Sequence, residues 1–276
     1  MPDVTTAVPD DATRSAVLRL AADIEEADGA PPLSDQARSL LRSPSVRHVI
    51  AREDDRLVGY AQRDGDSAEV VAQPGAVTAL LDAVATPGLL VWSHGRHSRL
   101  DAALTDRGFA SVRELHQLRR PLTDLPAAPS LPDGVAIRPF EPGRDDAAWL
   151  AVNAAAFASH PEQGRWTQDD LAARMAQPWF DPAGFLLAER DGELLGYHWT
   201  KIHPDGAGEV YVLGIAPAAQ GLGLGNALLV LGLRHLAERG STEVLLYVDG
   251  DNPGALRLYE RAGFRPYDLD VQWRLP

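Results

Sequence analysis

One ten-residue pattern occurs twice in this chain, and it requires the two halves to fold in the same way. Residues 51–60 read AREDDRLVGY and residues 188–197 read AERDGELLGY. Each copy places apolar residues on both sides of a tight acidic turn, which predicts a β-hairpin. Two further matches follow in the same order: Glu-Val-Val ahead of Pro74 against Glu-Val-Tyr ahead of Pro217, and Arg-Gly-Phe at 107–109 against Ala-Gly-Phe at 262–264. Three matches in one order indicate a duplicated fold.

The length and a proline-rich stretch predict where the two copies meet. With 276 residues the chain suffices for two domains of ordinary size. Residues 121–134 contain four prolines and few large apolar side chains, which is typical of a semi-rigid linker. We therefore expect an N-terminal domain over 1–122, a linker over 123–134 and a C-terminal domain over 135–276.

The C-terminal half alternates strand and helix patterns, which predicts an α/β domain with a mixed central sheet flanked by helices. Thr167 is the expected N-cap of one helix, and Gly240 is expected to end another. The predicted strands are 135–138, 184–189, 194–202, 209–215, 243–248 and 271–275. The predicted helices are 145–157, 167–176, 226–239 and 253–262.

Composition excludes several classes of function. The formal charge of −13 disfavours a nucleic-acid partner. No apolar run approaches the roughly 20 residues that cross a bilayer, so no membrane association is expected. The N-terminus has no secretory signal pattern, and we expect a cytoplasmic monomer. The chain has no cysteine, which excludes disulfides, thiolate metal sites and an acyl-cysteine intermediate. Lys201 is the only lysine among 26 cationic residues, so it is a candidate for a role that arginine cannot fill.

The chemistry is predicted to centre on a glycine-rich loop, Gln220-Gly221-Leu222-Gly223-Leu224-Gly225-Asn226. Alternating glycines allow successive backbone N–H groups to close around an anion, at the N-terminus of the following helix. This pattern predicts a pyrophosphate site. A Rossmann fingerprint would need G-x-G-x-x-G, and a Walker loop would end in Gly-Lys-Ser/Thr, so neither fits. A glycine-rich turn without a ligand remains an alternative.

A second motif gives the loop its context. Residues 252–259 read NPGALRLY and are followed by Gly263-Phe264. The two motifs in this order resemble the acetyl-CoA signature of the GNAT superfamily. The resemblance implies that acetyl-CoA is the co-substrate, that the glycine loop binds its diphosphate, and that a bulged strand at 213–215 supplies donors to the thioester. It implies these cofactor-binding residues: Leu213, Gly214, Ile215, Gln220, Gly221, Leu222, Gly223, Leu224, Gly225, Asn226, Asn252, Pro253, Gly254, Ala255, Leu256 and Arg257.

Within that superfamily, further segments resemble the tandem-domain mycothiol synthases. These segments are 152–158, 160–164, 179–182, 196–201 and 208–214. The resemblance covers essentially the whole chain and is strongest over 135–276. It implies transfer of acetyl to the cysteinyl amine of a cysteine–glucosamine–inositol conjugate, a small thiol sugar.

The resemblance also implies two catalytic roles. An α-amino group titrates near 7.7–8.0, so a carboxylate acting directly or through water can activate it. Glu209 is expected to be this base, although an ordinary strand-end carboxylate is the alternative. Tyr259 is expected to protonate the leaving thiolate, although an aromatic residue in helix packing is the alternative.

The substrate-binding residues implied by the resemblance are Asp35, Glu162, Lys201, Glu209 and Tyr247. Asp35 stands where the family carries a glutamate. Residues 70–77 read VVAQPGAV, with one glycine where the family carries an arginine-rich glycine loop, so we expect the N-terminal copy to be degenerate. His160 is expected to be structural, and the eight histidines show no metal-ligand spacing, so no metal is expected.

Three other functions remain open from the sequence. The chain could acetylate another small amine or a protein N-terminus on the same fold. It could bind an acyl-CoA without catalysis, although Glu209 and Tyr259 argue against this. A dinucleotide-dependent redox enzyme is disfavoured by the glycine spacing.

Overall fold

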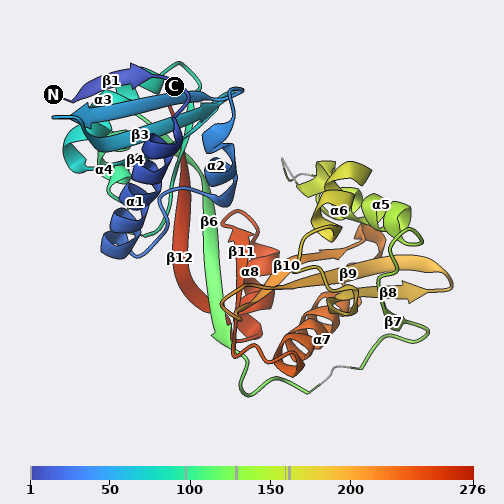
Figure 1. Cartoon of the computed structure of the whole chain (residues 1–276). Coiled ribbons are helices and arrows are strands. Elements are labelled where there is room, and N and C mark those ends of the chain that lie inside the picture. The colour runs from blue at the N-terminus through green and yellow to red at the C-terminus, as the bar shows by residue number, and fades with distance from the viewer. Residues whose placement is uncertain (1, 97, 128–129, 159, 161–162) are drawn as a thin grey trace. The chain divides into compact units, whose positions relative to one another are not determined.

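A computed structural model describes residues 2–96, 98–127, 130–158, 160 and 163–276. The chain divides into two compact units (Figure 1). The first comprises Met1–His116, Asp249–Asp251 and Asp268–Pro276, and the second comprises Gln117–Val248 and Asn252–Tyr267. The C-terminal segment Asp268–Pro276 thus packs with the N-terminal half of the chain.

The first unit is a mixed sheet with helices. Strands β1 to β4 pair antiparallel in sequence order, β4 pairs parallel with β5, and β12 pairs antiparallel with β5. Its elements are β1 (Asp3–Thr6), α1 (Asp11–Asp28), α2 (Asp35–Ser39), the 3₁₀ turn η1 (Leu40–Arg42), β2 (Arg47–Glu53), β3 (Arg56–Asp64), β4 (Ser67–Ala72), α3 (Pro74–Val84), β5 (Leu90–Ser93), α4 (Leu100–Asp106) and the start of β6 (Ala110–Pro121).

The second unit repeats this order. Strands β7 to β10 pair antiparallel in sequence order, and β10 pairs parallel with β11. Its elements are β7 (Ala136–Pro139), α5 (Asp146–Ala156), η2 (Gln163–Arg165), α6 (Gln168–Met175), η3 (Pro182–Gly184), β8 (Phe185–Arg190), β9 (Glu193–Ile202), β10 (Gly208–Ile215), η4 (Pro217–Ala219), α7 (Leu224–Glu238), β11 (Glu243–Asp249), α8 (Pro253–Arg261) and the start of β12 (Arg265–Arg274).

The two predicted hairpins are confirmed, and they match in detail. The turn of the first has φ of +48° at Asp54 and +62° at Asp55, and that of the second has +53° at Asp191 and +82° at Gly192. Two successive residues with positive φ are the mark of the two-residue turn that suits the twist of a hairpin. Each hairpin also shifts register at the same place, after Ala51 in one and after Ala188 in the other. A shared irregularity of this kind supports duplication.

The core of the second unit lies on both faces of the β8–β10 sheet (Figure 1). On one face α7 buries Leu228, Leu229 and Leu233 completely. On the other face Trp149 of α5 packs edge to face against Trp199 of β9 at 5.8 Å between ring centroids. Each large side chain buried in this way contributes about 1.5–3 kcal/mol. This packing on both faces stabilises the sheet that carries the loops at its ends.

The termini of several elements follow local chemistry. Thr167 is the N-cap of α6, as predicted, and it forms a capping box with Asp170. Gly240 follows the end of α7 with φ of +94°. Helix α7 begins at Leu224, two residues before the predicted start. Strand β12 begins at Arg265, well before the predicted 271.

Strand β12 is supported by backbone groups that are distant in the chain. Its carboxylates Asp268 and Asp270 accept hydrogen bonds from the backbone N–H groups of Arg96 and Gly95 at 2.8 and 3.0 Å. Aspartate is uncommon in strands, and these hydrogen bonds give the two carboxylates partners inside the strand.

Candidate functional site

The glycine loop forms a group of backbone donors at the start of α7. Gly221 and Gly223 have φ of +82° and +79°, a region that side chains with a Cβ rarely adopt. Gly223 is the N-cap, and no side chain caps the helix. Among the described residues, the N–H groups of Gly221, Leu222 and Gly223 have no hydrogen-bond partner. Together with the free N–H groups of the first helical turn, they can bind an anion such as a diphosphate.

The strand before the loop separates from its parallel neighbour. Within the described residues of β10 and β11, parallel pairing covers only Gly208 with Val244 and Glu209 with Leu245. Beyond Glu209, β10 continues to Ile215 without β11 beside it in register. The parting of the strands leaves the β11-facing edge of β10 available to a ligand.

The bulge in β10 was predicted at Gly214, and this position was wrong. The register with β9 shifts between Val210 and Val212, so Tyr211 is the extra residue, whereas Gly214 pairs regularly with Tyr197. Gly214 has a different role: a Cβ there would lie 2.7–2.9 Å from the Tyr197 ring. The glycine is therefore needed for close packing.

An acid–base cluster lies where β10 leaves β11. Glu209 pairs across the strands with Lys201 of β9. Its carboxylate Oε2 is 2.7 Å from His203 Nε2 and 3.4 Å from Lys201 Nζ. The exposed fraction of the side chain is 9% for Glu209, 18% for Lys201 and 27% for His203. Among the described residues Glu209 Oε1 has no partner, so it is free to accept a hydrogen bond from an amine or a water.

Aromatic side chains surround the ammonium group of Lys201. Its Nζ lies 5.4 Å from the Trp179 ring centroid and 5.5 Å from that of Tyr211. These two rings meet edge to face at 4.9 Å. Burial raises the pKa of Tyr211, whose hydroxyl accepts a hydrogen bond from Arg174 Nε at 3.1 Å. The ammonium group is thus fixed by cation–π contacts and its carboxylate partner.

Tyr259 lies on the inner face of α8. The residue is 7% exposed, and its ring packs edge to face against Phe264 at 5.7 Å. Burial raises the pKa of Tyr259 well above its ordinary value, so the hydroxyl keeps its proton at neutral pH. No hydrogen-bond partner occupies this hydroxyl within the described part of the chain. The group can therefore donate a proton to a ligand.

Comparisons with known proteins agree with this geometry. Residues 149–264 match the model of the acetyltransferase (GNAT) family. A mycothiol acetyltransferase of Thermomonospora curvata is 51% identical, over 95% of this chain and 93% of that protein. A mycothiol acetyltransferase of Streptomyces avermitilis is also 51% identical, over 94% of this chain and 90% of that protein. This chain belongs to the mycothiol acetyltransferase family. It is an acetyl-CoA-dependent N-acetyltransferase, so the dinucleotide and non-catalytic alternatives fall away.

Solved structures confirm the tandem fold of this mycothiol acetyltransferase family member. A GCN5-related N-acetyltransferase from Sphaerobacter thermophilus superposes with a TM-score of 0.73 at 26% identity, covering 98% of this chain and 95% of that chain. A tandem GNAT protein from the clavulanic acid biosynthesis pathway gives 0.69 at 19% identity, covering 99% and 98%. The predicted class of two tandem GNAT-type α/β domains is therefore confirmed.

The other residues that the family resemblance implied are placed as follows. Tyr247 on β11 is 45% exposed, and its hydroxyl accepts a hydrogen bond from Gln117 Nε2 at 2.6 Å. Asn252 caps α8: its side-chain oxygen accepts a hydrogen bond from the Ala255 N–H at 3.0 Å. The segment 252–257 consists of this cap and the first residues of the helix. Asp35 is the exposed first residue of α2 in the first unit. Glu162 lies outside the described residues. Their substrate and cofactor contacts stay predictions.

Sequence reasoning missed His203 and Tyr211 as members of the site in this family member. His203 follows Lys201 by two residues, so both side chains lie on one face of the hairpin. That spacing alone does not show that both side chains meet Glu209, which depends on the register of β9 and β10. Tyr211 reaches Lys201 because the bulge alters the alternation of β10, and no sequence pattern marked the bulge there.

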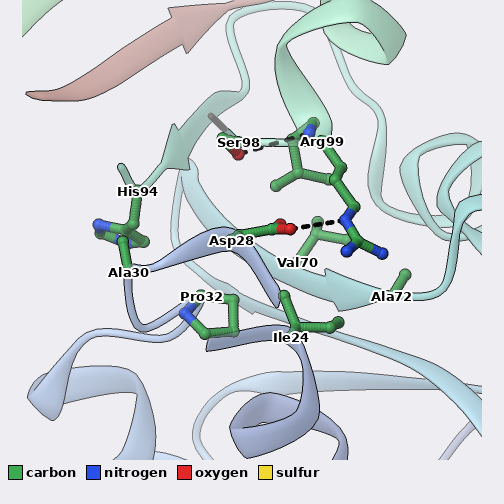
Figure 2. A pocket seen from close by; sticks show the side chains of 10 residues that line it. Ile24, Asp28, Ala30, Pro32, Val70, Ala72, His94, Ser98 and Arg99 are labelled. Atoms are coloured by element: carbon green, nitrogen blue, oxygen red, sulfur yellow. Dashed lines mark hydrogen bonds and ion pairs between the residues drawn. The ribbon is translucent and has the colours of Figure 1, made fainter. Parts of the chain in front are cut away.

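The N-terminal copy of the family fold has a pocket of its own (Figure 2). Its walls are mostly apolar, and its two opposite charges pair with each other: Arg99 Nε donates to Asp28 Oδ1 at 2.6 Å. The pocket is lined by Ile24, Asp28, Ala30, Pro32, Val70, Ala72, His94, Ser98, Arg99 and Leu100. The pocket thus presents side chains, whereas the glycine loop presents unpaired backbone N–H groups.

Among the described residues, no group of three or more histidine, aspartate or glutamate side chains is arranged to hold a metal ion. No helix in this described part of the chain has the length and apolar character needed to cross a membrane.

Proposed function

We propose that this chain transfers the acetyl group of acetyl-CoA to the cysteinyl amine of a cysteine–glucosamine–inositol conjugate, the last step of mycothiol formation. The observation that carries the proposal is the free oxygen of Glu209, at the point where β10 parts from β11. The same strand leads into the glycine loop. An amine held at Glu209 and a thioester held along β10 would therefore meet.

The cofactor would bind through backbone groups. The N–H groups at 221–226 would hold the diphosphate of acetyl-CoA, and the segment 252–257 would flank it. Backbone groups of Leu213, Gly214 and Ile215 would contact the pantetheine arm and the thioester oxygen. Donors aimed at that oxygen stabilise the negative charge of a tetrahedral intermediate, an effect worth roughly 10²–10³ in rate for one donor in other enzymes.

The chemical step would be a direct transfer. Glu209 takes a proton from the substrate ammonium, directly or through a water, and the freed amine nitrogen attacks the thioester carbon. The tetrahedral intermediate collapses by breaking the carbon–sulfur bond, and the sulfur receives the proton of Tyr259. The second proton on the nitrogen, which the amide product does not keep, passes through water to the phenolate and restores the Tyr259 hydroxyl. Since the chain has no cysteine, an acyl-cysteine intermediate is excluded.

Substrate recognition would combine charge and sugar contacts. Lys201, held by Glu209 and the rings of Trp179 and Tyr211, can donate to sugar hydroxyls. Tyr247 is exposed enough to contact the substrate. Glu162 and Asp35 would add carboxylates, as the family resemblance implies. We expect the acidic, monomeric protein to act in the cytoplasm without a metal.

The test is to weigh the product. Purified protein is incubated with acetyl-CoA and the conjugate, and in parallel with simple amines and a peptide, and each mixture is examined by mass spectrometry. Acetylation of the conjugate far above the other amines is expected. If another amine is acetylated better, the substrate assignment fails while the acetyl-CoA site remains.

A further inference from the structure

His203 makes a contact with the acid–base cluster that the catalytic roles above leave unused. The residue lies directly after β9, in the loop that joins β9 to β10. Its backbone is held there at both ends: the His203 N–H donates to the Ala207 oxygen at 2.8 Å, and the His203 oxygen accepts from the Gly206 N–H at 2.9 Å. The imidazole therefore projects from a fixed point of the hairpin.

The contact is directed at one oxygen of Glu209. His203 Nε2 and Lys201 Nζ both approach Oε2, at 2.7 and 3.4 Å, and Oε1 has no partner in the described part of the chain. A carboxylate with two rotatable bonds beyond its Cβ would otherwise present its oxygens in several orientations. Because His203 and Lys201 both contact Oε2, Oε1 is the oxygen that points away from them.

The chemistry of the contact also defines the state of the imidazole. An ionised carboxylate only accepts hydrogen bonds, so the hydrogen must be on His203 Nε2. A nitrogen that already carries a proton cannot take another one from Glu209. The contact is therefore suited to holding the carboxylate and not to removing its proton.

We propose that His203 is a positioning residue for acetyl transfer: by donating from Nε2 to Oε2 of Glu209, it aims the free Oε1 at the substrate amine. This inference rests on the proposed function, because it assigns the amine to Oε1. The His203 side chain is 27% exposed and that of Glu209 9%, so His203 is the more exposed member of the pair.

Two substitutions test the proposal through steady-state kinetics. His203→Ala removes the donor, and His203→Gln keeps an N–H at a similar reach. We expect kcat over KM for the amine to fall at least tenfold in His203→Ala, with KM for acetyl-CoA unchanged within about twofold, and His203→Gln to recover most of the loss. The matched control is His235→Ala, because His235 also faces a carboxylate, with Nε2 3.5 Å from Asp181 Oδ2, and we expect wild-type rates.

Three kinetic results would overturn the proposal. His203→Ala could retain wild-type kinetics. His203→Gln could be as slow as the alanine variant, with added imidazole restoring the latter, which would make His203 a proton carrier. A loss confined to KM for acetyl-CoA would make its role structural.

A measurement without turnover separates this inference from the substrate assignment. Long-range ¹H–¹⁵N spectra of the full chain report which ring nitrogen of His203 carries the hydrogen. We expect Nε2–H in the wild type and an altered pattern in Glu209→Gln. A hydrogen on Nδ1 alone would overturn the inference, even if the protein acetylates the conjugate. If the wild-type protein fails to acetylate the conjugate, only the proposed substrate is overturned.

Discussion

Glu69 and Glu209 hold corresponding positions in the two copies of the fold. Each lies where the parallel pair of its unit is in register, opposite Trp92 of β5 and Leu245 of β11. The Glu69 carboxylate accepts hydrogen bonds from the N–H and the hydroxyl of Ser34, at 2.7 and 2.5 Å, and faces His94 Nε2 at 3.5 Å. Both of its oxygens are thus occupied, whereas Glu209 has one free oxygen.

The counterpart of Tyr259 is also lost in the first unit. The Phe109 N–H donates to Leu104 O after α4, just as the Phe264 N–H donates to Tyr259 O after α8. Leu104 therefore occupies the tyrosine's place and has no proton to donate. With its carboxylate occupied and its hydroxyl absent, the N-terminal copy lacks the groups that the proposed chemistry requires.

The first prediction compares the two carboxylates. Glu209→Gln is expected to lower kcat by roughly 10²–10⁴, because it removes the base. It also removes the charge that pairs with Lys201. Glu69→Gln is expected to keep turnover of the folded protein near wild type and to lower the thermal midpoint, because it weakens a buried hydrogen-bonded cluster. Turnover is measured by mass spectrometry and unfolding by circular dichroism. Glu193→Gln, on the exposed start of β9, is the control for both.

The second prediction concerns the proton donor. Tyr259→Phe keeps the buried ring and its contact with Phe264, so the fold should be intact. We expect kcat to fall roughly 10–100-fold because the thiolate leaves unprotonated. Because burial keeps the pKa of Tyr259 far above its usual range, its hydroxyl should not titrate in the rate profile between pH 6 and 9. Tyr267→Phe, at an exposed tyrosine, should change nothing, and full activity in Tyr259→Phe would remove the assigned role.

The third prediction separates strain from ligand binding in α7. Gly223 precedes the helix and Gly240 follows it, with φ of +79° and +94°. Alanine at either position should lower the free energy of unfolding by about 1–2 kcal/mol, since both need the left-handed region. Only Gly223→Ala should also raise KM for acetyl-CoA. Equal KM values in the two variants would mean that the loop does not bind the cofactor.

The fourth prediction is a pH dependence of stability that comes from His94. Burial alone would lower its pKa, but hydrogen bonds and charges from Asp270 and Glu69 outweigh burial and raise the pKa to about 9. Because the folded pKa exceeds the unfolded value near 6.5, the stabilisation is complete below pH 6.5 and is lost as the pH rises through 9. Its size is on the order of 3 kcal/mol.

Thermal unfolding between pH 6 and 10 checks this dependence. The wild-type midpoint should fall steadily above pH 6.5, and a variant with His94→Gln should show a flatter curve. Other charges near the cluster are Asp268, whose carboxylate accepts from the Arg96 N–H, and the paired Asp28 and Arg99. Parallel curves for wild type and variant would contradict the prediction.

Local patterns predicted much of this molecule because local chemistry determines those features. The acidic turns, the capping box at Thr167 and the glycine loop each depend on a few neighbouring residues. The features that sequence reasoning missed depend on partners distant in the chain. The bulge at Tyr211 is a property of pairing with β9, and the early start of β12 depends on backbone groups at Gly95 and Arg96.

The candidate site shows the same division. Glu209 and Lys201 came from the family resemblance, and the structure brings them within 3.4 Å. His203 gave no motif, because its importance comes from the hairpin that returns Glu209 to it. Contacts of that kind become visible only when the register of two strands is known.

The packing of residues 268–276, which include most of β12, in the first unit has a consequence for biosynthesis. Val271 pairs with Ser93 of β5, and Leu275 is hydrogen-bonded through both its N–H and its oxygen to residues 88 and 89. A ribosome releases a chain from its N-terminus, at roughly 5–20 residues per second, and domains usually fold in that order. Here β5 of the first unit needs a neighbouring strand that lies far later in the chain. The first unit can therefore complete its sheet only after residues 268–276 have emerged from the ribosome.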